Sequence, residues 1–461
     1  MKRNSLIAVL VLTFIAALFA AGNLTGILHS SDTALAVTRW LAIAAFVAYA
    51  CVRRTLGTWI LVAMVAGAAI GHDFPSFAVN LRILAQIFLR LIKTIIAPLI
   101  FASLVSGIAG HADLKAVGRM GIKALVYFEF VTTLALFIGL TAINLSQAGV
   151  GAQIPKSPTE QLNVEKLTAT DTILHVFPEN IAKSVADNQV LQVVVFSVIF
   201  GIALALVKKE EKRRPMLAFT ESLTEVMFKF TNIIMLFAPI GVLGAIAYTV
   251  GSTGIGILGN LAKLLLTLYL ALSAFLLFVL LPVALLAKIP LRAFIRAVSE
   301  PATIAFATSS SEAALPRAME CMEAFGVPRS IVAFVMPTGY SFNLDGSTLY
   351  LSLAAIFVAQ AAGLHLTIGH QIYIMLILML TSKGVAGVSR ASLVILLATA
   401  GTVGLPTEPI FILLGVDQLM DMARTAVNVI GNCLATVVIA RWEGQFGATQ
   451  PSAAALEAIA E

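Results

Sequence analysis

Long apolar stretches alternate with short polar loops along most of this chain. A membrane-spanning helix needs about 20 mostly apolar residues. Candidate stretches lie near residues 5–21, 36–51, 57–71, 84–109, 121–145, 189–207, 222–250, 259–287, 329–361 and 409–440. Two more, near 293–325 and 371–406, carry small and polar residues in their middles. The pattern predicts an all-α integral membrane protein with a polar insert near 149–187.

The composition agrees with this pattern. Of the 461 residues, 59% are hydrophobic and 12% are charged, whereas soluble domains carry roughly 25% charged residues. The net charge of +6 comes from basic residues in short runs between apolar stretches, where they orient a membrane protein, so it indicates no nucleic-acid partner. The three cysteines are far apart and match no disulfide framework or metal site. We expect a lipid bilayer as the partner and no cofactor.

The basic loops predict the orientation. When the N-terminus is placed in the cytoplasm, the clusters around Arg53, Lys115, Lys208 and Lys288 also fall inside, and so does Arg441 near the C-terminus. The opposite loops, near 22–35, 72–80 and 362–370, contain no Lys or Arg. The count of crossings requires each interrupted segment to enter and leave on one side, as a re-entrant hairpin.

The first apolar segment has a second interpretation. Lys2 and Arg3 precede an apolar run that ends in small residues from Ala20 to Gly22, which also suits a cleaved signal peptide.

Polar residues inside a membrane are costly, so they are functional candidates. The last apolar segment places six of them on one helical face. They are Asp417, Asp421, Arg424, Thr425, Asn428 and Asn432. Arg424 offers a fork of donors for a carboxylate, and Asp421 offers an acceptor for an ammonium group. Alternatively, Asp421 and Arg424 pair internally and the amides join helices.

Three other clusters interrupt apolar segments. The first, residues 308–316, contains three consecutive serines, Glu312 and Pro316, which suits the first turn of a half-helix. The second, residues 381–389, contains Gly384 and Gly387, which permit a sharp reversal. Half-helix ends expose unpaired backbone groups, and two such hairpins in one chain predict a transporter binding site. Taken alone, the triple-serine segment could equally be an ordinary polar turn, so the prediction of a binding site rests on the pair of hairpins.

The remaining cluster, residues 337–347, lies within a long apolar segment. Pro337, Gly339 and Gly346 interrupt it, and Asn343 and Asp345 stand at the predicted break. Unwound carbonyls with amide and carboxylate oxygens suit a cation or a proton. The alternative is a proline-kinked helix with a stray acid.

Together these segments resemble the dicarboxylate/amino acid:cation symporters, the glutamate transporter family. Asn-Leu-Asp-Gly-Ser at 343–347 is similar to the family's unwound-helix motif. Ser-Ser-Ser-Glu-Ala-Ala-Leu-Pro at 309–316 resembles the tip of its first hairpin, and Asp-Met-Ala-Arg-Thr-Ala-Val-Asn at 421–428 resembles its last helix. The resemblance covers residues 57–443.

The resemblance implies a homotrimer in which a transport domain slides like an elevator along a fixed scaffold. The fold would be an eight-helix core with two re-entrant helical hairpins, preceded by two extra N-terminal transmembrane helices. The divisions would be 1–54 for the extra helices, 55–287 for mainly scaffold and trimerisation helices with part of the transport domain, 288–443 for the core of the transport domain and 444–461 for a cytoplasmic tail. The second hairpin would be the extracellular gate.

The resemblance also implies roles for individual residues. Arg424 would hold the distal carboxylate of the substrate, and Asp421 its amino group. The α-carboxylate of the substrate would be held by Ser311, Thr425, Asn428 and the backbone near Val388. Ser310 and Ser347 would be further substrate-binding residues. Cation or proton coupling would involve Glu312, Gly339, Asn343, Asp345, Asn428 and Asn432. Asn343 and Asp345 would bind metal only if sodium is carried.

Departures from the family pattern bear on the coupling ion. Sodium-coupled members end the last motif in an acid, where this chain has Asn432. Their third-helix hydroxyls are replaced by Phe128 and Val131, which leaves Thr132, and Leu351 stands where many members have Gln or Glu. The pattern is closest to bacterial proton/glutamate symporters.

We therefore expect a symporter that imports glutamate or aspartate with protons across the cytoplasmic membrane. Glu312, Asp345 and Glu129 remain as intramembrane acids, and burial favours the neutral form of a carboxyl. Glu312 is the preferred proton carrier, although it would also suit a helix cap. The alternatives are a C4-dicarboxylate symporter, whose branch of the family usually has no acid at the position of Asp421, and a sodium-coupled symporter. We do not expect an enzyme, since no histidine lies in the polar clusters; a passive channel is a further alternative.

Overall fold

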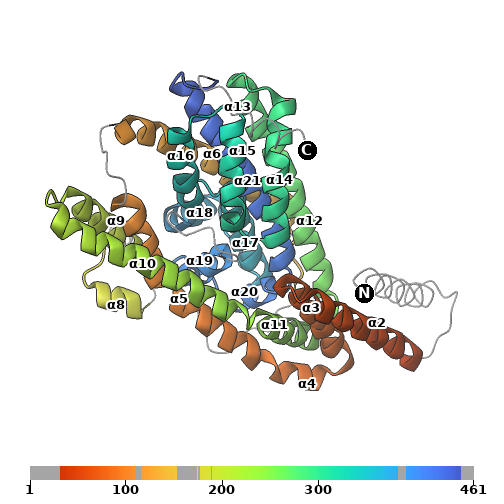
Figure 1. The fold of residues 1–461 in the computed structure, drawn as a ribbon. Helices are drawn as coiled ribbons and strands as arrows, with labels where there is room; N and C mark the ends of the chain where they lie inside the picture. Colours follow the sequence, from red (N-terminus) through yellow and green to blue (C-terminus); the bar gives the residue numbers. More distant parts are fainter. Residues whose placement is uncertain are drawn as a thin grey trace.

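The structure is a computed structural model that describes residues 32–109, 116–152, 174, 177–187, 189–382 and 391–447 (Figure 1). Its first described helices are α2 (Asp32–Arg53), α3 (Leu56–Asp73), α4 (Pro75–Asn80), α5 (Arg82–Ala109), α6 (Ala116–Ser146), α8 (Ile181–Ala186) and α9 (Val190–Leu206). They are followed by α10 (Glu210–Met235), α11 (Ala238–Thr253), α12 (Ile257–Phe275), the π-helical turn η1 (Leu276–Leu280) and α13 (Leu281–Leu286). The C-terminal part contains α14 (Leu291–Thr308), α15 (Ser311–Ala324), α16 (Arg329–Phe342), α17 (Asp345–Ala361), α18 (Ile368–Ser382), α19 (Ala391–Ala400), α20 (Glu408–Leu413) and α21 (Asp417–Trp442).

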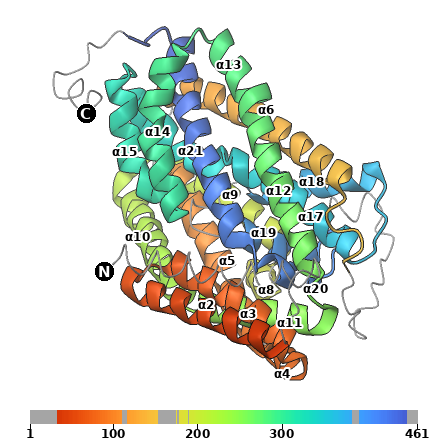
Figure 2. The ribbon, with the colours of Figure 1, turned by 90° about the vertical axis from the view of Figure 1, so that its right-hand side faces the viewer.

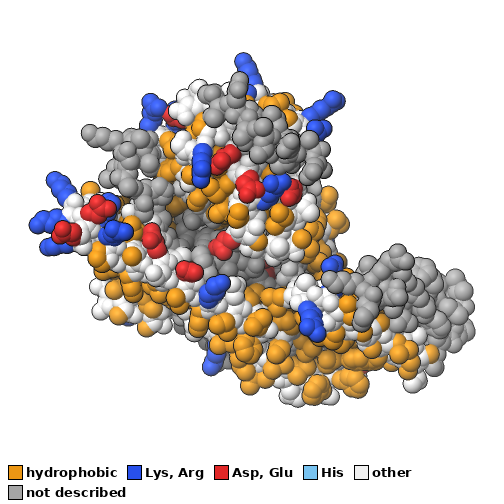
Figure 3. All heavy atoms as spheres, in the orientation of Figure 1, with side chains coloured by type: hydrophobic (Ala, Val, Ile, Leu, Met, Phe, Trp, Pro, Cys, Tyr) orange, Lys and Arg blue, Asp and Glu red, His pale blue; other side chains and the backbone are white. Residues whose placement is uncertain are grey.

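The helices confirm the prediction of an all-α, multi-pass membrane protein. Six of the described helices are long and apolar enough to cross a membrane, or seven if the bent pair α10–α11 forms one span. Large apolar side chains such as Leu286, which is 84% exposed, lie on the outside, as expected for surface that faces lipid. Figure 3 shows them spread over the lower part of the molecule, whereas most charged side chains gather above and to the left.

The helices pack in two groups. α3 packs along α11, and α5 packs along α9, α10 and α11. In the second group, α6 lies against α17 and α12, and α21 contacts α12, α14, α15, α16 and α17. Figure 2 shows α21 between α14 and α12, with α2, α3 and α4 along the lower edge. The first hairpin and the interrupted helix α16–α17 therefore meet around α21, whereas α18 and α19 pack against α17.

The first interrupted segment is a helical hairpin, as predicted. α14 and α15 pack against each other, and the chain reverses at Ser309 and Ser310. The prediction that Pro316 opens the second half was wrong, because α15 begins at Ser311 and Pro316 lies inside it. Ser310 is the residue that caps this helix, since its Oγ accepts a hydrogen bond from the Ala313 amide at 3.3 Å.

The second interrupted segment consists of α18 and α19, which also pack against each other. Its predicted tip, with Gly384, Gly387 and Val388, lies outside the described residues, as does the first apolar segment near 5–21.

The break in the long apolar segment is narrower than predicted. Only Asn343 and Leu344 separate α16 from α17. Pro337 and Gly339 lie inside α16, and Gly346 lies in the first turn of α17. Proline is tolerated inside a membrane helix where neighbouring groups satisfy the freed backbone, so it did not mark the break.

Two apolar segments expected as single helices are divided. The segment near 222–250 bends by 47° between α10 and α11, where Pro239 stands in the first turn of α11 and cannot continue the preceding helix. The segment near 409–440 consists of α20 and α21, joined by a turn at 414–416.

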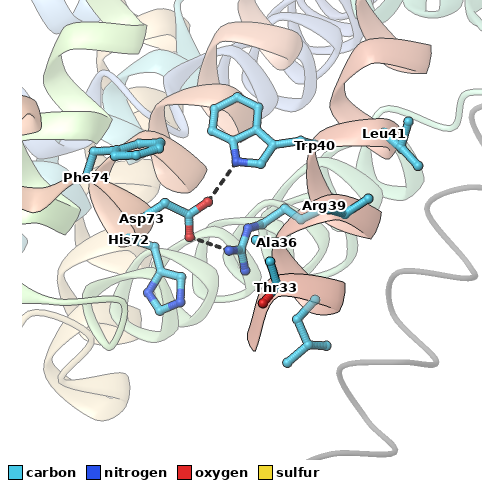
Figure 4. A pocket seen from close by; sticks show the side chains of 10 residues that line it. Thr33, Ala36, Arg39, Trp40, Leu41, His72, Asp73 and Phe74 are labelled. Atoms are coloured by element: carbon cyan, nitrogen blue, oxygen red, sulfur yellow. Dashed lines mark hydrogen bonds and ion pairs between the residues drawn. The ribbon is translucent and has the colours of Figure 1, made fainter. Parts of the chain in front are cut away.

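A cavity of about 780 Å³ lies between α2 and the corner where α3 meets α4 (Figure 4). At its edge Trp40 Nε1 donates to Asp73 Oδ2 at 2.9 Å, and Arg39 pairs with the same carboxylate. These contacts attach α2 to α3. The cavity contains no residue of the polar clusters and is not the candidate site.

Residues 443–447, which we call the C-terminal strap, fasten the end of α21 to two other elements. Glu443 pairs with Arg119 and Lys123 at the start of α6, each at 2.6 Å. The Phe446 ring lies 5.5 Å from the ring of Phe325, at the end of α15, and the Gly447 amide donates to the Gly326 carbonyl at 2.9 Å. The strap therefore ties the first hairpin and α6 to α21.

The strap generates a prediction about stability. The hydrogen bond from Lys123, together with Arg119, lowers the pKa of Glu443 below its usual value. Replacing Glu443→Gln removes two charge-assisted contacts and should lower the free energy of unfolding by about 1–3 kcal/mol at pH 7. Thermal unfolding in detergent measures this, with the exposed Glu211→Gln as a control.

Because the folded-state pKa of Glu443 is lowered, its stabilisation is present above the ordinary glutamate pKa and lost as the pH falls through the folded value. The difference between wild type and Glu443→Gln should thus shrink below about pH 4. A difference that stays constant down to pH 3 would contradict an ionised Glu443 in these pairs.

Candidate substrate-binding site

The polar stripe predicted on the last helix exists and is buried. All six of its members, from Asp417 to Asn432, lie in the interior. Arg424 is 1% exposed, the largest of the fully buried side chains. A buried charge is tolerated only when it is paired, so the partners of this guanidinium define the site.

Arg424 lies between two carboxylates. Its Nε donates to Asp421 Oδ1 at 2.8 Å, and its Nη1 donates to Asp417 Oδ1 at 3.2 Å. The Nη2 atom is 2.7 Å from Asp421 Oδ1 in an ion pair but has no hydrogen-bond acceptor among the described residues. The pairing of Asp421 with Arg424 considered from the sequence is therefore present, and a donor of the fork is still left over.

Two neighbours of Arg424 were not assigned to the site from the sequence. Asp417 lies two helical turns before it on the same face, so the stripe contained the signal, but only Asp421 was expected as a partner. Tyr350 belongs to α17, and its ring centre lies 4.1 Å from the guanidinium carbon, close enough for a cation–π contact. No feature of the sequence places that ring against α21.

The tip of the first hairpin is fastened to the start of α21. Gln418 Nε2 donates to Ser309 Oγ at 2.9 Å. Ser311 is 1% exposed, and its Oγ has no hydrogen-bond partner among the described residues. Glu312 is half-buried in the first turn of α15. The hairpin thus brings an available hydroxyl and a carboxyl toward the polar helix.

Asn428 joins two helices, which is the alternative role considered for the amides of the stripe. Its Oδ1 accepts hydrogen bonds from the Gly346 amide at 2.8 Å and the Ser347 amide at 3.2 Å, and its Nδ2 donates to Ser347 Oγ at 3.0 Å. Asn428 therefore caps the N-terminus of α17 from a neighbouring helix. Ser347 and Asn428, both expected at the substrate, lie together, and their described hydrogen bonds link the start of α17 to α21. Thr425 contacts the Asp421 carboxylate at a marginal 3.5 Å.

Four of the residues expected at the cation or proton site lie together: Gly339, Asn343, Asp345 and Asn432. Asn343 Nδ2 donates to Asp345 Oδ2 at 3.3 Å and to Asn432 Oδ1 at 3.2 Å, and all three side chains are buried. A Cβ at Gly339 would overlap Asn432 Oδ1, and one at Gly431 would overlap Asp345 Oδ2. These glycines leave room for the polar cluster.

The third-helix hydroxyl is engaged elsewhere. Thr132 Oγ1 donates to the carbonyl of Phe128, one turn earlier on α6, at 2.7 Å. Glu129 is half-buried on the same helix. Across the described part of the chain, no three His, Cys, Asp or Glu side chains are grouped to hold a metal ion.

Comparison with known proteins identifies the family. A family model described as the "Sodium:dicarboxylate symporter family" matches residues 56–442. The chain belongs to this family. The match confirms the resemblance inferred from the hairpin and helix motifs, and with it a transporter rather than an enzyme. It begins after α2.

Relatives in this symporter family carry two kinds of name. A "Proton/sodium-glutamate symport protein" from Bacillus caldotenax is 43% identical over 398 residues, 84% of this chain and 94% of the relative. The "Proton/glutamate-aspartate symporter" of Escherichia coli is 44% identical over 413 residues, 86% of this chain and 94% of the relative. A "C4-dicarboxylate transport protein" from Rhizobium johnstonii is 42% identical over 403 residues, which cover 86% of this chain and 90% of the relative. Overall identity therefore does not separate the two substrate classes.

Arg424→Ala should abolish binding of acidic substrates, because it removes the buried guanidinium and leaves Asp417 and Asp421 without it. Loss of such a contact costs about 2–5 kcal/mol, or roughly 30- to several-thousand-fold in affinity. Titration of purified protein measures the loss, with the exposed Arg329→Ala as the matched control. Unchanged affinity in a folded Arg424→Ala protein would remove Arg424 from the site.

Proposed function

We propose that this protein is a secondary active symporter that imports glutamate or aspartate together with protons. It would reside in the cytoplasmic membrane with both termini in the cytoplasm. Support comes from its family, from the names of its relatives, and above all from one observation. Two buried donors, Arg424 Nη2 and Ser311 Oγ, have no hydrogen-bond acceptor among the described residues, and buried polar groups in native proteins rarely go unpaired.

An acidic amino acid complements these donors. Its distal carboxylate would bind Arg424, and its ammonium group would take the place of the guanidinium beside Asp421. The substrate carboxylate would replace Asp421 as a partner of Arg424, and the substrate ammonium would replace Arg424 as the partner of Asp421. Each buried charge would therefore keep a partner of opposite sign. The backbone near Val388, outside the described residues, would complete the α-carboxylate site as the family resemblance implies.

Charge balance favours coupling to a cation. The two aspartates and Arg424, when ionised, leave one negative charge in excess, and glutamate or aspartate adds another. A charge moved into a low-dielectric interior must be neutralised. A proton or metal cation that enters with the substrate provides that neutralisation, and the gradient of that cation drives accumulation.

The family implies sodium as one candidate, and the cluster around Asp345 suits it poorly. Sodium prefers hard oxygen ligands. At Asn432, Oδ1 already accepts from Asn343, and Nδ2 is a donor. The Thr132 hydroxyl bonds its own helix. The acids Asp345, which is fully buried, and Glu312, which is half-buried at the hairpin tip, remain as proton carriers.

The packing suits an elevator, which we include in the proposal. The group of α3, α5, α9, α10 and α11 would be the scaffold of a homotrimer. The group around α21, with α6, α12 and both hairpins, would be the moving transport domain. In this proposal α6 and α12 would be the part of the transport domain that is expected within residues 55–287.

Asp421 should decide between an amino acid and a plain dicarboxylate. Asp421→Ser leaves the substrate ammonium without a counter-charge in a dry pocket, so aspartate affinity should fall by about 100-fold or more, and succinate affinity much less. Competition binding with the two ligands measures the ratio, and the exposed Asp187→Ser is the matched control. A wild-type protein that prefers succinate would establish the dicarboxylate alternative.

Proton coupling is tested by uptake in proteoliposomes. An inward proton gradient without sodium should drive accumulation of aspartate. Glu312→Gln should retain exchange of internal for external aspartate but lose the dependence on pH, because the amide cannot carry a proton. Glu320→Gln, at an exposed position on the same helix, is the control. Strict dependence on sodium, with no response to the proton gradient, would contradict the proposed coupling.

A further inference from the structure

The reversal of the first hairpin has an unfavourable backbone conformation. Ser309 has φ +52° and ψ +33°, in the left-handed region that residues with a side chain rarely adopt. It is nonetheless 2% exposed, so the surrounding structure holds it there. Conformations of this kind persist only where neighbouring contacts fix them.

Gln418 supplies such a contact. Its side-chain amide donates to Ser309 Oγ at 2.9 Å, across 109 positions of sequence. A third element adjoins the same amide, since a Cβ built on Gly57 of α3 would lie 3.6 Å from Gln418 Nε2. Gln418 therefore stands where the hairpin tip, the start of α21 and the start of α3 meet.

The neighbours of this contact belong to the proposed substrate site. Gln418 directly follows Asp417, which accepts a hydrogen bond from Arg424. Ser309 directly precedes Ser310, which caps α15, and Ser311 comes next with the hydroxyl that has no partner among the described residues. One side-chain hydrogen bond thus joins the segment that carries the guanidinium to the segment that carries the serines.

We infer that Gln418 is a positioning residue that holds the tip of the first hairpin against α21, so that Ser311 and Arg424 face one substrate together. It acts through Ser309 and does not itself contact the substrate. The inference rests on the proposed function for its effect on affinity, but its effect on the hairpin tip can be measured without any substrate.

The variant Gln418→Met keeps the length of the side chain and removes its donor. Amide hydrogen exchange of residues 308–313 should become several-fold faster, while exchange in α6 and α17 stays unchanged. The affinity for aspartate should fall by roughly 2- to 13-fold, the range for a lost hydrogen bond between neutral groups. Gln189→Met, at an exposed position before α9, is the matched control.

A double-mutant cycle shows whether the effect passes through Ser309. Ser309→Ala alone should loosen the tip as Gln418→Met does, and the two changes together should cost little more than either one. Gln418→Glu should restore tight binding in part, because its carboxylate can accept a hydrogen bond from the Ser309 hydroxyl.

Three outcomes would overturn the inference: unchanged exchange at the tip in Gln418→Met, additive effects in the cycle, or a looser tip with unchanged aspartate affinity. If the wild-type protein binds no acidic amino acid, the proposed function fails, and the exchange measurements alone decide whether Gln418 holds the hairpin.

Discussion

A guanidinium group at the centre of an apolar helix bundle constrains everything around it. An unpaired ion in such an environment costs far more free energy than a protein's net stability. Arg424 is stabilised by Asp417 and Asp421 on its own helix and by the ring of Tyr350 on α17. Even well-paired buried ions seldom add stability compared with apolar residues. Their presence here is therefore better explained by a ligand that exchanges with them than by folding.

The same constraint accounts for the break between α16 and α17. The start of α17 passes so close to α21 that a Cβ on Gly346 would overlap the carbonyl oxygen of Arg424. The amides in its first turn are buried without partners in their own helix and need an acceptor, and Asn428 provides one. The break and the polar stripe thus depend on the same contact between α17 and α21. Gly346 allows the two helices to approach closely, and the side-chain amide of Asn428 accepts hydrogen bonds from the unpaired backbone of α17.

The sequence predicted those parts of the site that are costly in a membrane. The stripe from Asp417 to Asn432, both interrupted hairpins and the break at Asn343 all stand out because polar groups are rare in apolar helices. What it could not predict depends on neighbours far along the chain. Tyr350 is an unremarkable aromatic residue until α17 lies against α21, and Gln418 becomes significant only beside Ser309. Pro337 and Pro316 misled the prediction, because tertiary packing tolerates proline inside both helices.

The central claim is that the exchangeable ion pairs of α21 bind an acidic amino acid. Structure determination of the purified protein with L-aspartate, in sodium-free buffer, tests it most directly. The account predicts a substrate carboxylate on Arg424 Nη2, the substrate ammonium beside Asp421, and Ser311 Oγ within hydrogen-bonding distance of the ligand. Aspartate bound elsewhere, with the contacts of Arg424 to Asp417 and Asp421 unchanged, would contradict it.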